Sequence, residues 1–345
     1  MNSTITRGGG LLAAARRWGI PPDHWLDLSC GINRRGWPVP PLPASLWYQS
    51  FGGETDLDAV LHQWGRAPGS AGSLAVPGTR MAMRILPLLR APCRVGIPAQ
   101  APAELAEGWR LAGHTVLPVT REQSQAGDAW LNELDILVWT NPDARTGATV
   151  SRDRLLDWHG QLIGRDGWLV VDEAFVDGCE GTSLVPMSSA PGLVILRSLE
   201  TFFGLAGIRA GAVFAEPAVT DALAARLGPE AIGAPERYIM ARALKDLRWQ
   251  QHSVRRLAQD SERLDQALQK SGLPATTGTL LYRHLALPEA PLVADFLAGQ
   301  GILVRCFDAP SALRIDLPGD RFEWERLERT LQHLTNYIDH QRACC

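Results

Sequence analysis

Lysine is scarce in this sequence of 345 residues. It occurs only at Lys245 and Lys270, and the rest of the 34 basic residues are arginine. Genomic base composition alone can produce such a bias, so the scarcity excludes no activity by itself. It matters for any pattern that requires a lysine at one particular position, because very few positions can meet that requirement.

Long apolar runs, blocks of basic residues and C-x-x-C cysteine pairs are also absent. No segment approaches the roughly 20 apolar residues that span a bilayer, and Met1 to Gly10 lacks the apolar stretch of a secretory signal. A formal net charge of −3 offers nothing to a nucleic-acid backbone or an anionic membrane. The six cysteines form no C-x-x-C pair, so neither a zinc site nor a disulfide framework is indicated. We therefore expect a cytoplasmic protein with no metal and no nucleic-acid or membrane partner.

Short runs rich in Val, Ile and Leu alternate with helical patterns through the middle of the chain. Such runs are typical of strands buried on both faces, and the alternation predicts a mostly parallel sheet covered by helices. Pro102 and Ser151 are predicted to stand at the starts of two of the helices. The predicted strands are Ser73–Pro77, Arg94–Ile97, Thr115–Val119, Ile136–Thr140, Trp168–Val171, Leu193–Arg197 and Ala210–Phe214.

The pattern changes after about residue 235. A long helical stretch is predicted over roughly Glu236–Gln269. It is followed by an apolar run, a short helix, two further apolar runs and a last helix that follows Asp320. This is typical of a smaller α+β domain. The predicted organisation is an N-terminal segment that belongs with the small domain, a large α/β domain and a C-terminal small domain, with bounds at 1–40, 41–235 and 236–345.

Four loop stretches fall at the carboxyl ends of predicted strands, where ligands bind in open parallel sheets. Each one alone has an ordinary structural explanation, such as a helix cap or a loop carboxylate. Their order and spacing along the chain favour a common site. The stretches are Pro77–Arg80, Asn141–Gly147, Asp172–Phe175 and Ser198–Arg209.

These stretches resemble the landmarks of fold-type I pyridoxal-phosphate (PLP) enzymes: a Gly-Ser/Thr turn, Asn-Pro-x-x-x-Thr-Gly, Asp-x-Ala-Tyr/Phe and Ser-x-x-Lys-x-x-Gly-Leu-x-Gly-x-Arg. The similarity covers nearly the whole chain. Leu26–Ser29 and Phe203–Arg209 look most like the threonine-phosphate decarboxylase branch, which makes aminopropanol phosphate for cobalamin. Histidinol-phosphate aminotransferases are the nearest other branch. The resemblance implies a fold-type I PLP-transferase fold, a homodimer, and L-threonine O-phosphate as substrate.

The same resemblance implies a role for each matched residue. Asp172 would pair with the pyridine nitrogen of PLP, and Phe175 would lie beside the cofactor. The substrate would be bound by Arg314, through its carboxylate, and by Asn33. Residues that would hold the cofactor phosphate are Gly78, Thr79, Ser198 and Arg209.

The lysine of the family falls where Thr201 stands, because Ser198 lies three positions before it and Arg209 eight after it. A threonine cannot form an imine with PLP and supplies no amine to move the proton at Cα. The family's asparagine, which bonds the phenolic oxygen of PLP, aligns with Ala144, and its stacking ring aligns with Pro102 or a neighbour.

Several hypotheses follow. The chain is a decarboxylase-like enzyme in which free PLP condenses with the substrate and another base moves the proton. His114 or His159 could be that base, although each is expected to be a surface histidine. Alternatively it is a non-catalytic homologue that binds PLP, an amine or a pathway partner. A histidinol-phosphate aminotransferase-like enzyme is a further alternative. A different lysine-free reaction ranks last, because sugar-modifying relatives place a histidine where this chain has Thr201.

Overall fold

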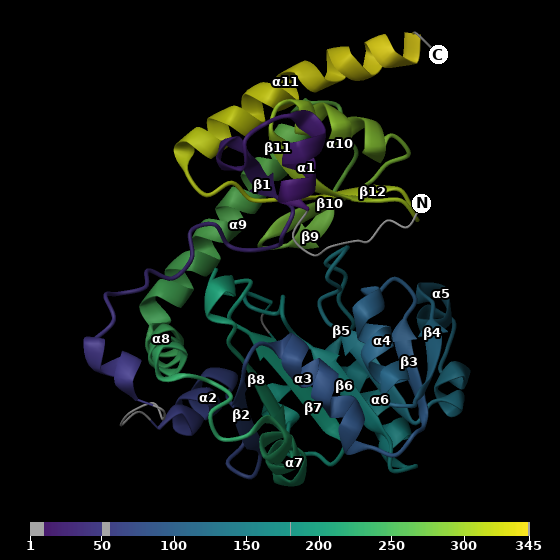
Figure 1. The fold of residues 1–345 in the computed structure, drawn as a ribbon. Helices are drawn as coiled ribbons and strands as arrows, with labels where there is room; N and C mark the ends of the chain where they lie inside the picture. Colours follow the sequence, from purple (N-terminus) through teal and green to yellow (C-terminus); the bar gives the residue numbers. More distant parts are fainter. Residues whose placement is uncertain (1–9, 50–55, 180, 344–345) are drawn as a thin grey trace. The chain divides into compact units, whose positions relative to one another are not determined.

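The computed structural model describes residues 10–49, 56–179 and 181–343, so Cys344 and Cys345 lie outside the described residues. The chain forms two compact units, which Figure 1 shows as ribbons. The large unit comprises Trp37–Ala144 and Thr149–Arg248, and the small unit comprises Met1–Gly36, Arg145–Ala148 and Trp249–Cys345. Within the described part of the chain, no helix is long and apolar enough to cross a membrane, and no group of His, Cys, Asp or Glu side chains could hold a metal ion.

A seven-stranded sheet forms the centre of the large unit, in the order β2-β8-β7-β6-β5-β3-β4. β3 to β7 run parallel, whereas β8 pairs antiparallel with both β2 and β7. This confirms the mostly parallel sheet, and the predicted strands agree with the observed ones to within a residue at each end. The strands are β2 (Gly72–Val76), β3 (Arg94–Pro98), β4 (Thr115–Val119), β5 (Ile136–Thr140), β6 (Trp168–Asp172), β7 (Leu193–Ser198) and β8 (Gly211–Ala215).

Helices cover both faces of this sheet (Figure 1). α3, α4 and α7 pack on the face that carries Val170 and Val213. α2 and α6 lie on the opposite face, where Trp64 contacts Phe214 and Trp158 contacts Trp139. The helices of the unit are η2 (Ala44–Tyr48), α2 (Leu57–Gly65), α3 (Thr79–Ile85), η3 (Leu86–Leu89), α4 (Ala103–Leu111), α5 (Arg121–Gln125), η4 (Ala129–Glu133), α6 (Arg152–Ile163), η5 (Val185–Met187), η6 (Ala206–Ile208), α7 (Pro217–Leu227) and α8 (Ala234–Lys245).

The helix starts follow the predicted capping residues. Pro102 stands at the N-cap of α4, and Ser151 Oγ accepts a hydrogen bond from the backbone N–H of Arg154 at the start of α6. The last helix, α11, begins after Asp320, whose carboxylate accepts from the backbone N–H of Glu323 at 2.9 Å. These contacts satisfy N–H groups that have no partner within the helix itself.

A five-stranded sheet forms the centre of the small unit, in the order β1-β11-β12-β10-β9. Only the β1–β11 pair is parallel, so the unit is α+β in character. Besides the long helix α9 (Leu247–Lys270), its elements are α1 (Leu11–Trp18), η1 (Pro22–His24), β1 (Leu26–Leu28), β9 (Thr277–Thr279), β10 (Tyr282–Ala286), α10 (Ala290–Gly299), β11 (Ile302–Phe307), β12 (Ala312–Asp316) and α11 (Arg321–Ala343).

The helical stretch predicted over roughly Glu236–Gln269 is present, but it consists of two helices. α8 ends at Lys245 and α9 (Leu247–Lys270) begins two residues later. Asp246 leaves the helical region with φ −82° and ψ 70°, and its carboxylate accepts a hydrogen bond of 3.1 Å from the indole N–H of Trp37. Because Trp37 is far away in sequence, the break depends on a tertiary contact that helical periodicity does not reveal.

A buried group of charges lies on the α2 face of the large sheet, just beyond β6. Arg197 forms an ion pair of 2.7 Å with Asp177 and stacks over the ring of Trp64. Glu173 is fully buried, and it accepts hydrogen bonds from Ser183 Oγ and from the backbone N–H of Leu184, both at 2.6 Å. Burial therefore raises the pKa of Glu173 from 4.5 to about 7, despite the nearby charge of Arg197.

We expect Glu173 to make the stability of the protein fall as the pH rises from about 4.5 to 7. In this window the folded protein holds a proton that the unfolded chain has released, so deprotonation favours unfolding, by at most about 3 kcal/mol. Glu173→Gln stays neutral and should lose less stability than the native chain between about pH 5 and pH 8. Urea unfolding at both pH values measures the difference. Equal losses in the two proteins would contradict it.

Candidate functional site

The candidate site lies where β2, β7 and β6 end on the same edge of the large sheet. Gly211, the first residue of β8, pairs with Val76 of β2 and with Ser198 of β7. This shared partner brings the turn after β2 next to the loop after β7. A Cβ atom on Gly211 would lie 3.1 Å from Thr79 Cγ2, so glycine is what allows Thr79 to pack against this strand.

Gly78 and Arg209 meet at this edge. Gly78 has a φ of 78°, and a Cβ atom there would lie 3.2 Å from Arg209 Nη2, so the guanidinium rests against the turn. Arg209 itself adopts a left-handed φ of 49°, which is uncommon for a long side chain and costs of the order of 1 kcal/mol. Two unusual backbone conformations therefore place one cation directly on the Gly78 turn.

Asp172 and Thr201 are linked through Ala174. The Asp172 carboxylate accepts a hydrogen bond of 3.1 Å from the backbone N–H of Ala174, and Thr201 Oγ1 donates to the carbonyl oxygen of the same residue. Thr201 is only 6% exposed. The loop after β7 is thus held against the end of β6, and the residue at the position of the family lysine has its hydroxyl bonded to the backbone. Phe175, the next residue along, is half-buried.

Two charged residues of this edge, Glu200 and Arg80, were not predicted from the sequence as site residues. Glu200 lies between Ser198 and Thr201, and its backbone N–H donates to Ser198 Oγ at 3.0 Å. Its carboxylate lies 3.4 Å from Arg209 Nη1 and 4.0 Å from Arg80 Nη2. Both residues lie within the loop stretches Ser198–Arg209 and Pro77–Arg80, which the sequence identifies as parts of one site. The position of Glu200 next to Thr201 is the signal that could have found them.

The other two predicted residues, Arg314 and Asn33, belong to the small unit. Arg314 is buried, donates to the carbonyl oxygen of Ser29 at 2.8 Å and lies over the ring of Tyr282. Asn33 Oδ1 accepts from Arg256 Nη2 at 3.0 Å and from the backbone N–H of Arg35. The structure thus gathers Gly78, Thr79, Asp172, Phe175, Ser198, Thr201 and Arg209 on one unit, and holds Arg314 and Asn33 in the other.

The two histidines considered as bases are buried rather than on the surface. His114 Nε2 lies 2.8 Å from the carbonyl oxygen of Pro87, and His159 Nε2 lies 2.8 Å from that of Pro191. Because a carbonyl oxygen only accepts, each Nε2 acts as a donor in these contacts. Neither ring therefore offers that nitrogen as a base, and the contacts explain both histidines as structural.

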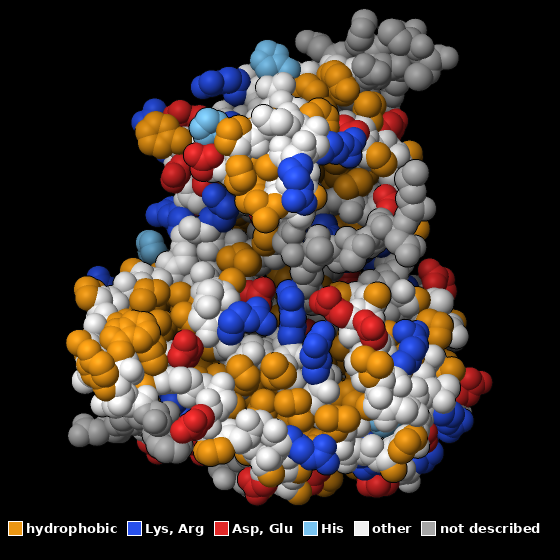
Figure 2. All heavy atoms as spheres, viewed as in Figure 1, with side chains coloured by type: hydrophobic (Ala, Val, Ile, Leu, Met, Phe, Trp, Pro, Cys, Tyr) orange, Lys and Arg blue, Asp and Glu red, His pale blue; other side chains and the backbone are white. Residues whose placement is uncertain are grey.

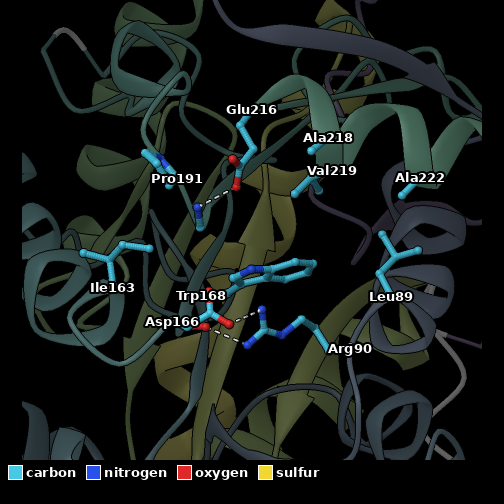
Figure 3. Close-up of a pocket in the computed structure, with 11 residues that line it drawn as sticks. Leu89, Arg90, Ile163, Asp166, Trp168, Pro191, Glu216, Ala218, Val219 and Ala222 are labelled. Atoms are coloured by element: carbon cyan, nitrogen blue, oxygen red, sulfur yellow. Dashed lines mark hydrogen bonds and ion pairs between the residues drawn. The ribbon is translucent and has the colours of Figure 1, made fainter.

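A hollow of about 320 Å³ lies at the opposite edge of the large sheet, where Trp168 begins β6. Figure 3 shows the Trp168 indole with the Arg90 guanidinium beside it. Arg90 is paired with Asp166, and Glu216 accepts from the backbone N–H of Gly192 at 2.9 Å. These partners account for the charged groups that line the hollow, so it does not compete with the candidate site.

Comparison with known proteins places the chain among PLP-fold proteins. The family model for class I and II aminotransferases matches residues 77–331. The chain is 38% identical to a threonine-phosphate decarboxylase from Pseudomonas aeruginosa, over 95% of this chain and 97% of that protein. It is 31% identical to a histidinol-phosphate aminotransferase from Pectobacterium carotovorum, over 60% of each protein.

The fold agrees with solved structures. A histidinol-phosphate aminotransferase from Sinorhizobium meliloti, solved in complex with pyridoxal 5′-phosphate, superimposes with a TM-score of 0.79 at 18% identity, over 97% of this chain and 99% of that one. This confirms the predicted fold-type I architecture. Since the family model spans well over half of the sequence and the Pseudomonas enzyme matches nearly all of it, the chain belongs to the class I and II aminotransferase family, in the branch of the threonine-phosphate decarboxylases.

Proposed function

We propose that this chain is a threonine-phosphate decarboxylase-type protein of cobalamin biosynthesis that holds PLP non-covalently and binds L-threonine O-phosphate. The 38% identity to a protein of that name over 95% of the chain supports the substrate class. The observation that carries the non-covalent mode is Thr201, whose buried hydroxyl donates to the Ala174 carbonyl where the family has its lysine.

The side chains at the carboxyl edge of the large sheet fit the two ends of PLP. Asp172, at the end of β6, is a carboxylate of the kind that pairs with a protonated pyridine nitrogen. Ser198 Oγ, Arg209 and the Gly78 turn form the donor set for a phosphate, and the planar guanidinium can bind two phosphate oxygens at once. A Cβ atom at residue 78 would meet Arg209, so glycine leaves room for the cation there.

Each residue has a definite task in this proposal. When bound, PLP supplies an electron sink for the bond that breaks at Cα. Asp172 keeps a positive charge on the ring nitrogen, and Arg209 and Ser198 orient the phosphate. Thr201 Oγ1 is a hydroxyl that donates to the Ala174 carbonyl, so it cannot take up or return the proton at Cα as an amine would.

Arg314 is proposed to bind the substrate carboxylate and Asn33 to lie beside the substrate. Arg314 Nε lies 3.5 Å from Asp316 Oδ1, and burial raises the pKa of that aspartate, because the charged form is poorly solvated there. Arg314 also donates to the carbonyl oxygen of Ser29, so its guanidinium is held in a fixed position.

A second candidate function is binding without turnover. The same Thr201 contact favours it, because the Thr201 hydroxyl is bonded to the Ala174 carbonyl and the loop is held in place without an amine at this position. Loss of a covalent nucleophile lowers rates by orders of magnitude, whereas loss of one hydrogen bond costs about 1–3 kcal/mol. The missing lysine therefore outweighs the smaller differences at Ala144 and Pro102.

We further propose that the protein is a cytoplasmic homodimer, as in the family. Figure 2 shows apolar side chains gathered on the surface over η2. In this helix Trp47 is 64% exposed and Tyr48 is 88% exposed. Large aromatic side chains this exposed are typical of surfaces that a second subunit covers.

We expect the native chain to bind PLP without a covalent bond at residue 201 and Thr201→Lys to form one, because only an amine condenses with the cofactor aldehyde. Borohydride reduction followed by peptide mass mapping measures this. The label should appear on residue 201 in the variant only. Labelling of Lys245 or Lys270 in both proteins serves as the control for non-specific reaction. A variant that shows no label on residue 201 would contradict the placement of Thr201 at the cofactor.

We also expect carbon dioxide release from L-threonine O-phosphate, with excess PLP, to be at least about a thousandfold faster in Thr201→Lys than in the native chain. Asp172→Ala in the Thr201→Lys background should remove this gain, because the ring then loses its proton. Rapid release by the native chain that depends on Asp172 would instead require another base. Release by neither protein, with PLP bound, would favour the binding function.

A further inference from the structure

Glu200 places a carboxylate among the cations of the phosphate donor set. Its two oxygens lie 3.4 Å from Arg209 and 4.0 Å from Arg80, and the backbone N–H of Glu200 is bonded to Ser198 Oγ. Arg209 in turn rests against the Gly78 turn. Glu200 therefore contacts Arg209 and Arg80 through its side chain and Ser198 through its backbone.

This carboxylate acts against a bound phosphate in two ways. It accepts a hydrogen bond from the Arg209 guanidinium, which a phosphate oxygen would need, and its charge repels a dianion. With Glu200 ionised, the group of Arg80, Arg209 and Glu200 carries one net positive charge instead of two. An electrostatic site for a doubly charged ligand is weakened when half of its positive charge is neutralised from within.

The ion pairs of Glu200 are weak enough to be displaced. The side chains of Arg209 and Arg80 are 48% and 38% exposed, and that of Glu200 is 29% exposed. Pairs this open to water contribute little to stability, because solvent screens them. A phosphate can thus enter, but it does so in competition with a carboxylate that is held close by the chain.

We propose that the carboxylate of Glu200 is a built-in competitor for the phosphate of the cofactor. The proposal rests on the proposed binding of PLP. With Thr201 unable to form a covalent link and Glu200 opposing the phosphate, the cofactor exchanges readily and the occupancy of the site follows the concentration of free PLP. A neutral side chain at residue 200 converts the site to one that retains the phosphate.

The test compares equilibrium dissociation constants for PLP, pyridoxal and inorganic phosphate in the native chain, in Glu200→Gln and in Glu133→Gln. Glutamine keeps the size of residue 200 and removes its charge. Glu133 is an exposed glutamate at the end of η4 in the same unit, so its variant controls for the change in net charge. Equilibrium dialysis gives all three constants without relying on turnover.

Glu200→Gln is expected to bind PLP about tenfold more tightly than the native chain, with pyridoxal binding unchanged and Glu133→Gln behaving as native. Equal PLP affinity in the native chain and in Glu200→Gln contradicts the role of Glu200 as a competitor and leaves the proposed binding of PLP intact. Tighter binding of inorganic phosphate by Glu200→Gln, with PLP bound by neither protein, supports Glu200 as a competitor for phosphate and contradicts PLP as the ligand. If neither protein binds PLP or phosphate, both the competitor role of Glu200 and the proposed binding of PLP are contradicted.

Discussion

β8 runs antiparallel between β2 and β7, and Gly211 at its start pairs with Val76 on one side and Ser198 on the other. Because β2 and β7 both end beside this residue, two loops that are about 120 residues apart in sequence become neighbours. The contact of Arg209 with Gly78 and the ion pairs of Glu200 depend on this arrangement. A slip in the register of β8 would separate all of them at once.

Two adjacent residues of the loop after β7, Glu200 and Thr201, set the chemistry of this edge. Thr201 removes the amine that would fix the cofactor, and Glu200 adds a negative charge where the phosphate would sit. The surrounding framework is intact, since Asp172 still ends β6 and Ser198 still ends β7. In our proposal these two neighbouring residues govern how a ligand is retained, while the strands that present them keep the family fold.

The strands of the large sheet could be predicted from the sequence because each is a short apolar run, and apolar runs report burial on both faces. The break at Asp246 could not, because it depends on the indole of Trp37. The contacts of His114 and His159 with the carbonyl groups of Pro87 and Pro191 join parts of the chain that are far apart in sequence. The pairing of Glu200 with Arg80 depends on the order of the strands. Local patterns predicted elements and motifs, whereas contacts between elements required the structure.

The proton held by Glu173 has a consequence for calorimetry. Since the pKa of Glu173 in the folded protein is about 7, unfolding near pH 6 releases this proton into the solution. The buffer takes it up, and the heat of that reaction adds to the heat of unfolding. The apparent unfolding enthalpy of this protein therefore depends on the choice of buffer, and extrapolation to a buffer of zero ionisation enthalpy gives the value that belongs to the protein alone.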